Sequence, residues 1–154
     1  GAGWAAAAGP ALLAAVLAAH AATVRTPAHG VLTHPDFSPA FMQDLVELAR
    51  RADRTIISDD MVLTLRAGKE VPWEPSIFAE LGGMGRWDER LIVDMIRDGR
   101  FAFAVTVGDR GSPIFESRYN PAVLEAMEAA FPRRIQRDWL LIRLPAGSDW
   151  TPRP

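Results

Sequence analysis

Cysteine is absent from this chain of 154 residues. Without thiols there is no disulfide framework, no thiolate metal site and no cysteine nucleophile, and the redox compartment cannot be inferred from cysteine usage. Lysine is nearly absent, because Lys69 is the only one among 17 basic residues, and the formal net charge is -2. Since nucleic-acid binding requires a strongly basic face, this charge balance argues against a nucleic-acid partner.

Charge is absent from the first 24 residues, which are mostly alanine and leucine. A membrane-spanning helix needs about 20 predominantly apolar residues, so the sequence predicts a transmembrane helix over residues 1–24, with membrane lipid as a partner. Two alternatives remain open. One is an export signal cleaved near Ala21, although the basic start that such signals carry is missing, and the other is an alanine-rich soluble helix.

Residues 25–37 contain Pro27, Gly30 and Pro35, a composition typical of a linker. Only Arg25 is basic before Arg50, whereas cytoplasmic flanks of membrane helices are rich in basic residues. The sequence therefore predicts a soluble domain over residues 38–154 on the extracytoplasmic side of the inner membrane. We also expect the chain to be a fragment of a longer protein whose other transmembrane helices precede it.

The domain alternates predicted helices and strands. Helices are predicted from Pro39, after Asp60 to Gly68, over residues 76–81, after Asp88 to Gly99, and from Pro121, and strands over residues 55–58, 101–107 and 138–144. The predicted apolar faces consist of Phe41, Leu45, Leu48 and Ala49 in the helix from Pro39, and of Val123, Leu124, Met127 and Phe131 in the helix from Pro121. The helix after Asp60 carries Met61, Val62 and Leu65. Because helices connect the first two strands, these strands should be parallel. The pattern predicts a small three-layer α/β domain with a short, partly parallel sheet.

Ser58, Asp59 and Asp60 follow the first predicted strand, at the edge where open α/β sheets bind ligands. The adjacent carboxylates of Asp59 and Asp60 could hold a divalent cation or act as a general base. The alternative, which we favour, is that Ser58 or Asp59 caps the next helix and complements its positive end. No glycine-rich phosphate loop follows the strand, so a dinucleotide cofactor is not expected.

Histidine is confined to the beginning of the chain, at positions 20, 29 and 34. His29, His34 and Asp36 could in principle bind zinc, but they lie in the predicted linker, where a solvated loop is the simpler interpretation. No nucleophile elbow is present. The sequence therefore predicts no metal site, no resident cofactor and no catalytic residue in this chain.

The segment of residues 70–88 combines Trp73, Glu74 and Trp87 in what we expect to be an exposed excursion of loop and helix. Aromatic rings pack on the C–H faces of sugars, and carboxylates accept hydrogen bonds from sugar hydroxyls. These three residues, with Asp59 and Asp60, are the candidate substrate-binding residues. The alternative is that both tryptophans are anchors that pin a long connection onto the sheet.

The order of several short motifs resembles the C-terminal soluble region of bacterial polytopic glycosyltransferases, of the protein O-mannosyltransferase and aminoarabinose transferase type. The motifs are Ile56-Ile57-Ser58-Asp59-Asp60, Leu65-Arg66-Ala67-Gly68-Lys69, Trp73-Glu74-Pro75, Gly85-Arg86-Trp87-Asp88 and Gly99-Arg100-Phe101. The resemblance covers residues 54–144.

This resemblance implies a polyprenyl-phosphate-linked sugar donor and inverting transfer on the extracytoplasmic face. In such enzymes the catalytic acidic residue lies in the first outer loop, near the start of the full protein, so no catalytic residue is carried over to this chain. The terminal domain would cover the active cleft or help to select the acceptor. The competing hypotheses are a membrane-tethered α/β binding or interaction module without enzymatic activity, and a small exported enzyme.

Overall fold

The computed structural model describes residues 13–19, 39–137 and 139–153 of the chain. Residues 13–19 form a short helix with exposed side chains, and residues 38–154 form a separate compact unit. No helix within these ranges has both the length and the apolarity needed to cross a membrane. The rest of the predicted transmembrane helix, the linker and all three histidines lie outside the described residues.

The compact unit is an α/β domain with a four-stranded mixed sheet. Its elements, in chain order, are α3 (Pro39–Arg51), β1 (Thr55–Ser58), α4 (Met61–Arg66), α5 (Pro75–Gly83), α6 (Arg90–Arg97), β2 (Phe101–Val107), α7 (Pro113–Glu116), α8 (Pro121–Ala130), β3 (Arg133–Arg137) and β4 (Leu140–Leu144). The predicted strands at 55–58 and 101–107 are confirmed to the residue. Gly68 and Gly99, which adopt positive φ angles of 70°, end α4 and α6 as predicted.

The strand order in the sheet is β1-β2-β4-β3. β1 and β2 are parallel, as predicted, and β4 pairs antiparallel with both β2 and β3. The prediction missed β3, because its sequence Arg-Arg-Ile-Gln-Arg lacks the apolar residues that mark a buried strand. It is an edge strand, where charged side chains are common since one side of the strand has no partner.

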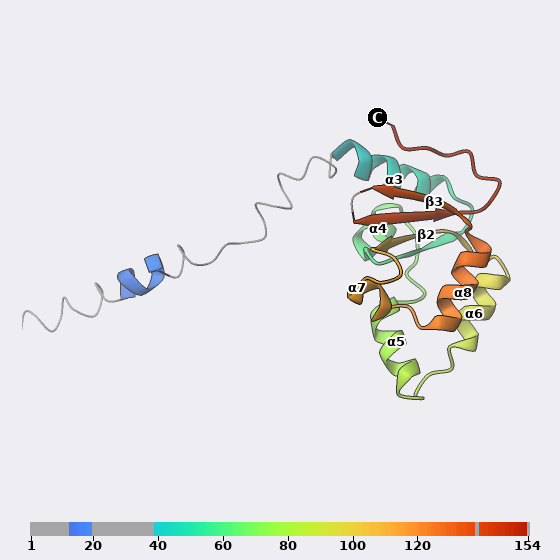
Figure 1. Cartoon of the computed structure of the whole chain (residues 1–154). Helices are drawn as coiled ribbons and strands as arrows, with labels where there is room; N and C mark the ends of the chain where they lie inside the picture. The colour runs from blue at the N-terminus through green and yellow to red at the C-terminus, as the bar shows by residue number, and fades with distance from the viewer. Residues whose placement is uncertain (1–12, 20–38, 138, 154) are drawn as a thin grey trace, which may run out of the picture. The chain divides into compact units, whose positions relative to one another are not determined.

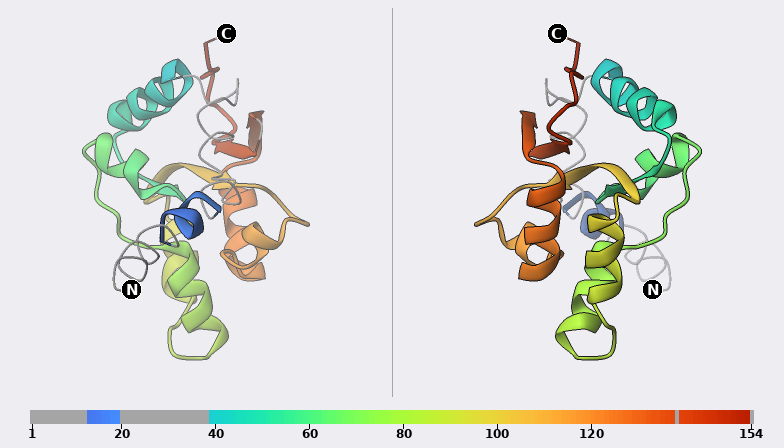
Figure 2. Two further views of the ribbon diagram at one scale, coloured as in Figure 1. Left: turned by 90° about the vertical axis from the view of Figure 1, so that its left-hand side faces the viewer. Right: turned by 90° about the vertical axis from the view of Figure 1, so that its right-hand side faces the viewer.

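Helices lie on both sides of this sheet. In Figure 1, α3 lies above the strands and α5, α6, α7 and α8 lie below them, and both views of Figure 2 show the same separation of α3 from α5. The main core cluster contains Ile57 of β1 and Ala104 of β2, together with residues of α6 and α8. Because side chains alternate along a strand, the buried Ile56 and Val105 point to the opposite face.

Phe41, Leu45 and Ala49 of α3 are buried at the predicted helical spacing, and so are Val123 and Met127 of α8. Their burial confirms the apolar faces predicted for these two helices, which hold the sheet between them.

The short helices depart from the prediction. In α4 the buried residues are Leu63 and Thr64, whereas Met61, Val62 and Leu65 are 45%, 57% and 64% exposed. Helix α7 was not predicted, because four residues after Ser112 are too few to show a period.

Candidate functional site

Asp59 directly follows β1, at the carboxyl edge of the two parallel strands. Its backbone N–H donates to the carbonyl oxygen of Val105 at 3.1 Å, which prolongs the strand pairing by one residue. Its side chain is only 1% exposed, and Oδ2 accepts a hydrogen bond of 2.6 Å from the backbone N–H of Val107 at the end of β2. The carboxylate therefore ties the ends of the two strands together.

Two residues that follow α7 complete the surroundings of this carboxylate. The hydroxyl of Tyr119 donates to Oδ1 of Asp59 at 2.8 Å, and the guanidinium of Arg118 lies 3.2 Å from Oδ2. Burial and then the negative charge of Asp59 raise the pKa of Tyr119 well above its usual value. Tyr119 is thus held as a neutral hydrogen-bond donor.

Neither Tyr119 nor Arg118 was predicted as a site residue. The hydrogen bond from Tyr119 joins residues 60 positions apart, and no local motif indicates such a contact. The one available signal is that Tyr119 is the only tyrosine in the chain.

Asp60 points to different partners from Asp59. Its Oδ1 accepts a hydrogen bond of 2.9 Å from the N–H of Val62, so Asp60 is the N-cap of α4. The hydroxyl of Ser58 accepts from the N–H of Asp60 and donates to its carbonyl oxygen, which shapes the turn. The expected helix cap exists, but Asp60 provides it rather than Ser58 or Asp59, because α4 begins at Met61, one residue later than a cap at Asp59 requires and two residues later than a cap at Ser58 requires.

Trp73 and Glu74 belong to the same neighbourhood. The ring of Trp73 meets the ring of Tyr119 edge to face, with centroids 6.0 Å apart. Trp73 is only 7% exposed and joins the core cluster, so the prediction of an exposed excursion is wrong at this residue. Its indole Nε1 is buried and has no hydrogen-bond partner among the described residues.

Glu74 is the N-cap of α5. Its carboxylate accepts hydrogen bonds from the N–H of Ile77 at 2.7 Å and from the hydroxyl of Ser76 at 2.7 Å. Burial acts to raise the pKa of Glu74, but these hydrogen bonds and the positive charge of Arg118 outweigh it, so the pKa is lowered. Glu74 therefore remains charged and electrostatically coupled to Arg118.

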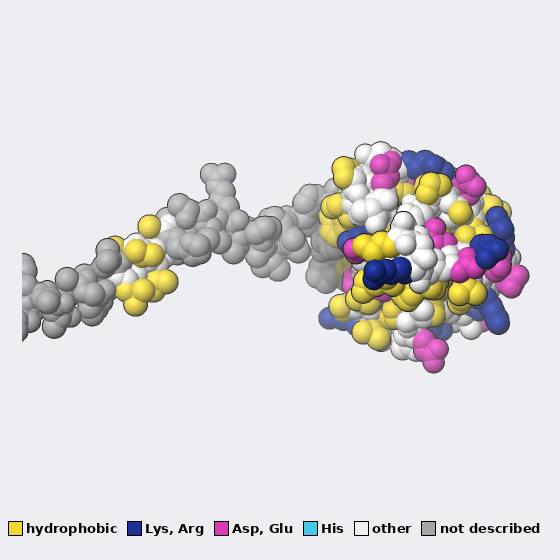
Figure 3. Space-filling model, turned by 90° about the horizontal axis from the view of Figure 1, so that it is seen from below, with side chains coloured by type: hydrophobic (Ala, Val, Ile, Leu, Met, Phe, Trp, Pro, Cys, Tyr) yellow, Lys and Arg dark blue, Asp and Glu magenta, His cyan; other side chains and the backbone are white. Residues whose placement is uncertain are grey.

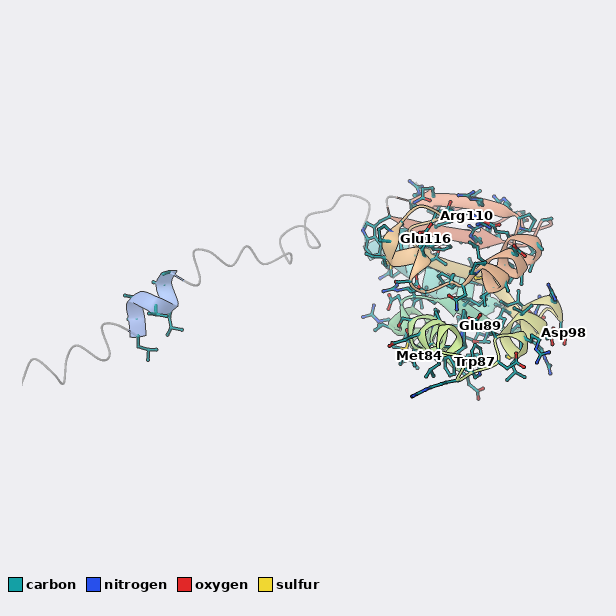
Figure 4. The ribbon with its side chains drawn as sticks, turned by 60° about the horizontal axis from the view of Figure 1, so that its bottom comes forward. Met84, Trp87, Glu89, Asp98, Arg110 and Glu116 are labelled. Atoms are coloured by element: carbon teal, nitrogen blue, oxygen red, sulfur yellow. The ribbon has the colours of Figure 1, made fainter. Side chains whose placement is uncertain are left out.

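Trp87 lies apart from this cluster. Its ring packs on Phe78 of α5 with centroids 4.7 Å apart, and both residues pack against the main core. Figure 4 shows Trp87 beside Met84 where α5 meets α6, away from Glu116 of α7. Its contacts are those of an anchor for the connection between α5 and α6.

A second polar cluster, which the sequence did not indicate, supports the antiparallel half of the sheet. Arg143 of β4 is 1% exposed and donates to Asp109 at 2.7 Å, while Glu128 lies 3.5 Å away. Arg134 of β3 also pairs with Asp109, and Arg110 pairs with Glu128. Burial lowers the pKa of Arg143, and the charge of Asp109 opposes that shift. These contacts link both strands of the hairpin to the loop after β2.

The carboxyl edge is therefore a closed network of Asp59, Arg118 and Tyr119, with Trp73 and Glu74 beside it. Both oxygens of Asp59 are engaged, so this carboxylate is a structural acceptor rather than a free base. Among the residues that the structure describes, no three His, Cys, Asp or Glu side chains are grouped to hold a metal ion.

In comparisons with known proteins, no family model, no curated protein and no solved structure matches this chain.

Proposed function

We propose that this chain is the water-exposed domain of a membrane glycosyltransferase that takes a sugar from a polyprenyl-phosphate-linked donor. In this proposal residues 1–24 span the membrane, and the three-layer α/β domain lies on the extracytoplasmic side. The membrane part upstream carries the catalytic residues. The order of motifs over residues 54–144 is the basis of the proposal.

The observation that carries the proposal is the convergence of two of these motifs. Asp59 and Trp73 are distant in sequence, yet both contact Tyr119. Glu74 is next to Trp73, and the charge of Arg118 makes the smallest of the contributions that lower its pKa. These two motifs thus meet at the carboxyl edge of the parallel strands, where α/β domains commonly place ligands.

Within the proposal this centre shapes a surface and performs no chemistry. The two oxygens of Asp59 are occupied by the N–H of Val107, the hydroxyl of Tyr119 and the guanidinium of Arg118. The side chain of Arg118 is 29% exposed, and a guanidinium has five N–H donors of a kind that suits a phosphate or a sugar hydroxyl. Arg118 and Glu74 are therefore the residues through which the domain would touch the donor or the acceptor.

The second candidate is a membrane-tethered binding module with no enzymatic activity. The exposed apolar side chains of Met61, Val62 and Leu65 favour it, because clustered apolar groups on a surface commonly mark a contact with another molecule. The same side chains are compatible with a domain that rests on the membrane part of an enzyme.

The experiment that separates these candidates is to read the gene upstream of the codon for Gly1 in the same frame. The proposal predicts several further apolar spans, with an aspartate or glutamate in the first outer loop. A start codon shortly before Gly1 would leave a single tethered domain, and the binding module would replace the glycosyltransferase.

A further inference from the structure

Helix α4 buries Leu63 and Thr64 but leaves three apolar side chains exposed, which is unusual for a surface helix of six residues. Its apolar residues Met61, Val62 and Leu65 are each at least 45% exposed, while the polar Thr64 is 2% exposed. Burial of an apolar side chain of this size stabilises a protein by about 1.5–3 kcal/mol, and these three side chains forgo much of that gain. Figure 3, which shows the domain from below, has hydrophobic side chains on the visible face among polar and charged ones.

A basic groove lies beside this helix, against α3. Its volume is about 690 Å³, and its lining includes Arg50, Arg66 and Arg153 with the apolar Met42 and Val46. The only carboxylate in the lining is Glu47, which pairs with Arg50 at 2.6 Å. Because Glu47 offsets the charge of Arg50 and Asp44 offsets that of Arg153, the excess positive charge of the groove is that of Arg66.

The groove and the exposed face of α4 are continuous. Arg66 is the last residue of α4 and lines the groove, and it follows Val62 by one helical turn. The guanidinium of Arg50 donates to the carbonyl oxygen of Arg66 at 3.3 Å, which joins α3 to the end of α4. Asp44 is already paired with Arg153. No ion pair of Arg66 is found within the described residues.

We propose that this surface, formed by Met61, Val62 and Leu65 with Arg50 and Arg66, docks on an anionic lipid bilayer. Apolar side chains enter the boundary between headgroups and acyl chains, and guanidiniums bind the lipid phosphates. The charge of the groove is complementary to such a surface and would disfavour a basic partner protein. The inference rests on the proposed function in one respect, since the membrane segment would hold the domain near the bilayer through residues 25–37, which span at most about 45 Å.

The absence of cysteine permits a direct test on the full chain. A fluorescent label is placed at Val62→Cys in one variant and at Ala129→Cys in a control, because Ala129 is exposed on α8. Both are reconstituted in vesicles of phosphatidylcholine, with and without phosphatidylglycerol, that contain a lipid quencher in the acyl chains.

Docking predicts quenching at position 62, dependent on phosphatidylglycerol and reduced by salt, and no quenching at position 129. Adding Arg66→Gln should reduce the ratio of docked to undocked domain roughly fivefold, as expected for one basic residue at an anionic surface. The proposal is overturned if the label at position 62 is not quenched, or if it is quenched no more than the label at position 129.

Two controls separate this inference from the proposed function. The first control is alkaline extraction of the vesicles. If the chain stays in the vesicles but the label at position 62 is unquenched, the membrane segment is supported and docking on lipid is overturned. If alkaline extraction removes the chain, the membrane segment is contradicted. Docking is then tested by adding vesicles to the chain in solution and measuring quenching at position 62. Cross-linking of two chains through position 62 would show that a second copy covers the surface, which also overturns docking on lipid.

Discussion

At the scale of single residues, Asp59 is the residue of the candidate site whose buried charge depends most on its neighbours. Its buried carboxylate accepts from the N–H of Val107 and the hydroxyl of Tyr119, and it offsets the charge of Arg118. An asparagine has one oxygen acceptor where the aspartate has two. Asp59→Asn therefore leaves one buried donor without an acceptor and Arg118 without its counter-charge.

We expect Asp59→Asn to lower the free energy of unfolding by about 2–4 kcal/mol. Urea unfolding followed by circular dichroism measures this change. The matched control is Asp53→Asn, because Asp53 pairs with its neighbour Arg54 on the surface and its side chain is 79% exposed. The control should leave the free energy of unfolding almost unchanged, because solvent screens an ion pair between exposed side chains. Equal effects of the two variants would contradict the structural role of Asp59.

Tyr119 gives a second prediction at this scale, because it is the only tyrosine and its titration is free of overlap. Burial and the charge of Asp59 raise its pKa in the folded state, so the folded protein holds the proton more tightly than the unfolded chain. The contribution of Tyr119 to stability is complete below pH of about 10 and is lost as the pH rises through the folded value.

Phenolate absorbance should therefore rise at a higher pH than it does for free tyrosine, and its rise should coincide with alkaline unfolding. A tyrosine that ionises near its usual pKa while the protein is folded would contradict the buried hydrogen bond. Removal of the charge in Asp59→Asn should bring the titration closer to its ordinary range.

The sequence indicated part of this site and missed the rest for a physical reason. Asp59, Trp73 and Glu74 stand out because of their place after a strand or within an unusual local composition. Tyr119 and Arg118 belong to a turn between two short helices, and their importance comes only from tertiary contacts. The prediction that Ser58 or Asp59 caps the helix was wrong, because Asp60 is the N-cap and the carboxylate of Asp59 accepts from Val107 and Tyr119, contacts that only the tertiary structure determines.

At the scale of secondary structure elements, α4 offers a matched pair of leucines on one helix. Leu63 is 1% exposed and Leu65 is 64% exposed. We expect Leu63→Ala to lower the free energy of unfolding by about 2–4 kcal/mol, through lost burial and a residual cavity. Leu65→Ala should change it by less than about 0.5 kcal/mol. Denaturant titration of the two variants measures both effects, and a large loss for Leu65→Ala would show that the outer face of α4 is covered by the chain itself.

The predictions were most accurate for long helices and strands that bury one apolar face, because the spacing of the apolar residues shows in the sequence. The spacing of Phe41, Leu45 and Ala49 predicted α3, and the run Phe101–Val107 predicted β2. The sequence of β3 carries three arginines, and its strand conformation is imposed by pairing with β4. Short-range patterns do not contain that information, because an edge strand needs no apolar alternation.

At the scale of the whole molecule, the described surface has two faces of different chemistry. The carboxyl edge presents Arg118 and Glu74 above a closed network, and the surface of α4 and the basic groove presents apolar and cationic groups. A domain with the first face turned to a substrate and the second to a bilayer suits an enzyme whose donor is anchored in lipid. The two faces are formed by separate residues, so each proposal is tested by its own variants.

The measurement that tests the glycosyltransferase proposal most directly is sugar transfer in membranes from a labelled polyprenyl-phosphate sugar. It compares the product of the complete gene with the chain of residues 1–154. The account predicts transfer by the complete product and none by the chain alone, because the proposal places the catalytic residues in the membrane part upstream and both carboxylate oxygens of Asp59 are already engaged. Transfer by the chain alone, or a complete product that inserts in the membrane and consumes no polyprenyl-linked donor, would contradict it.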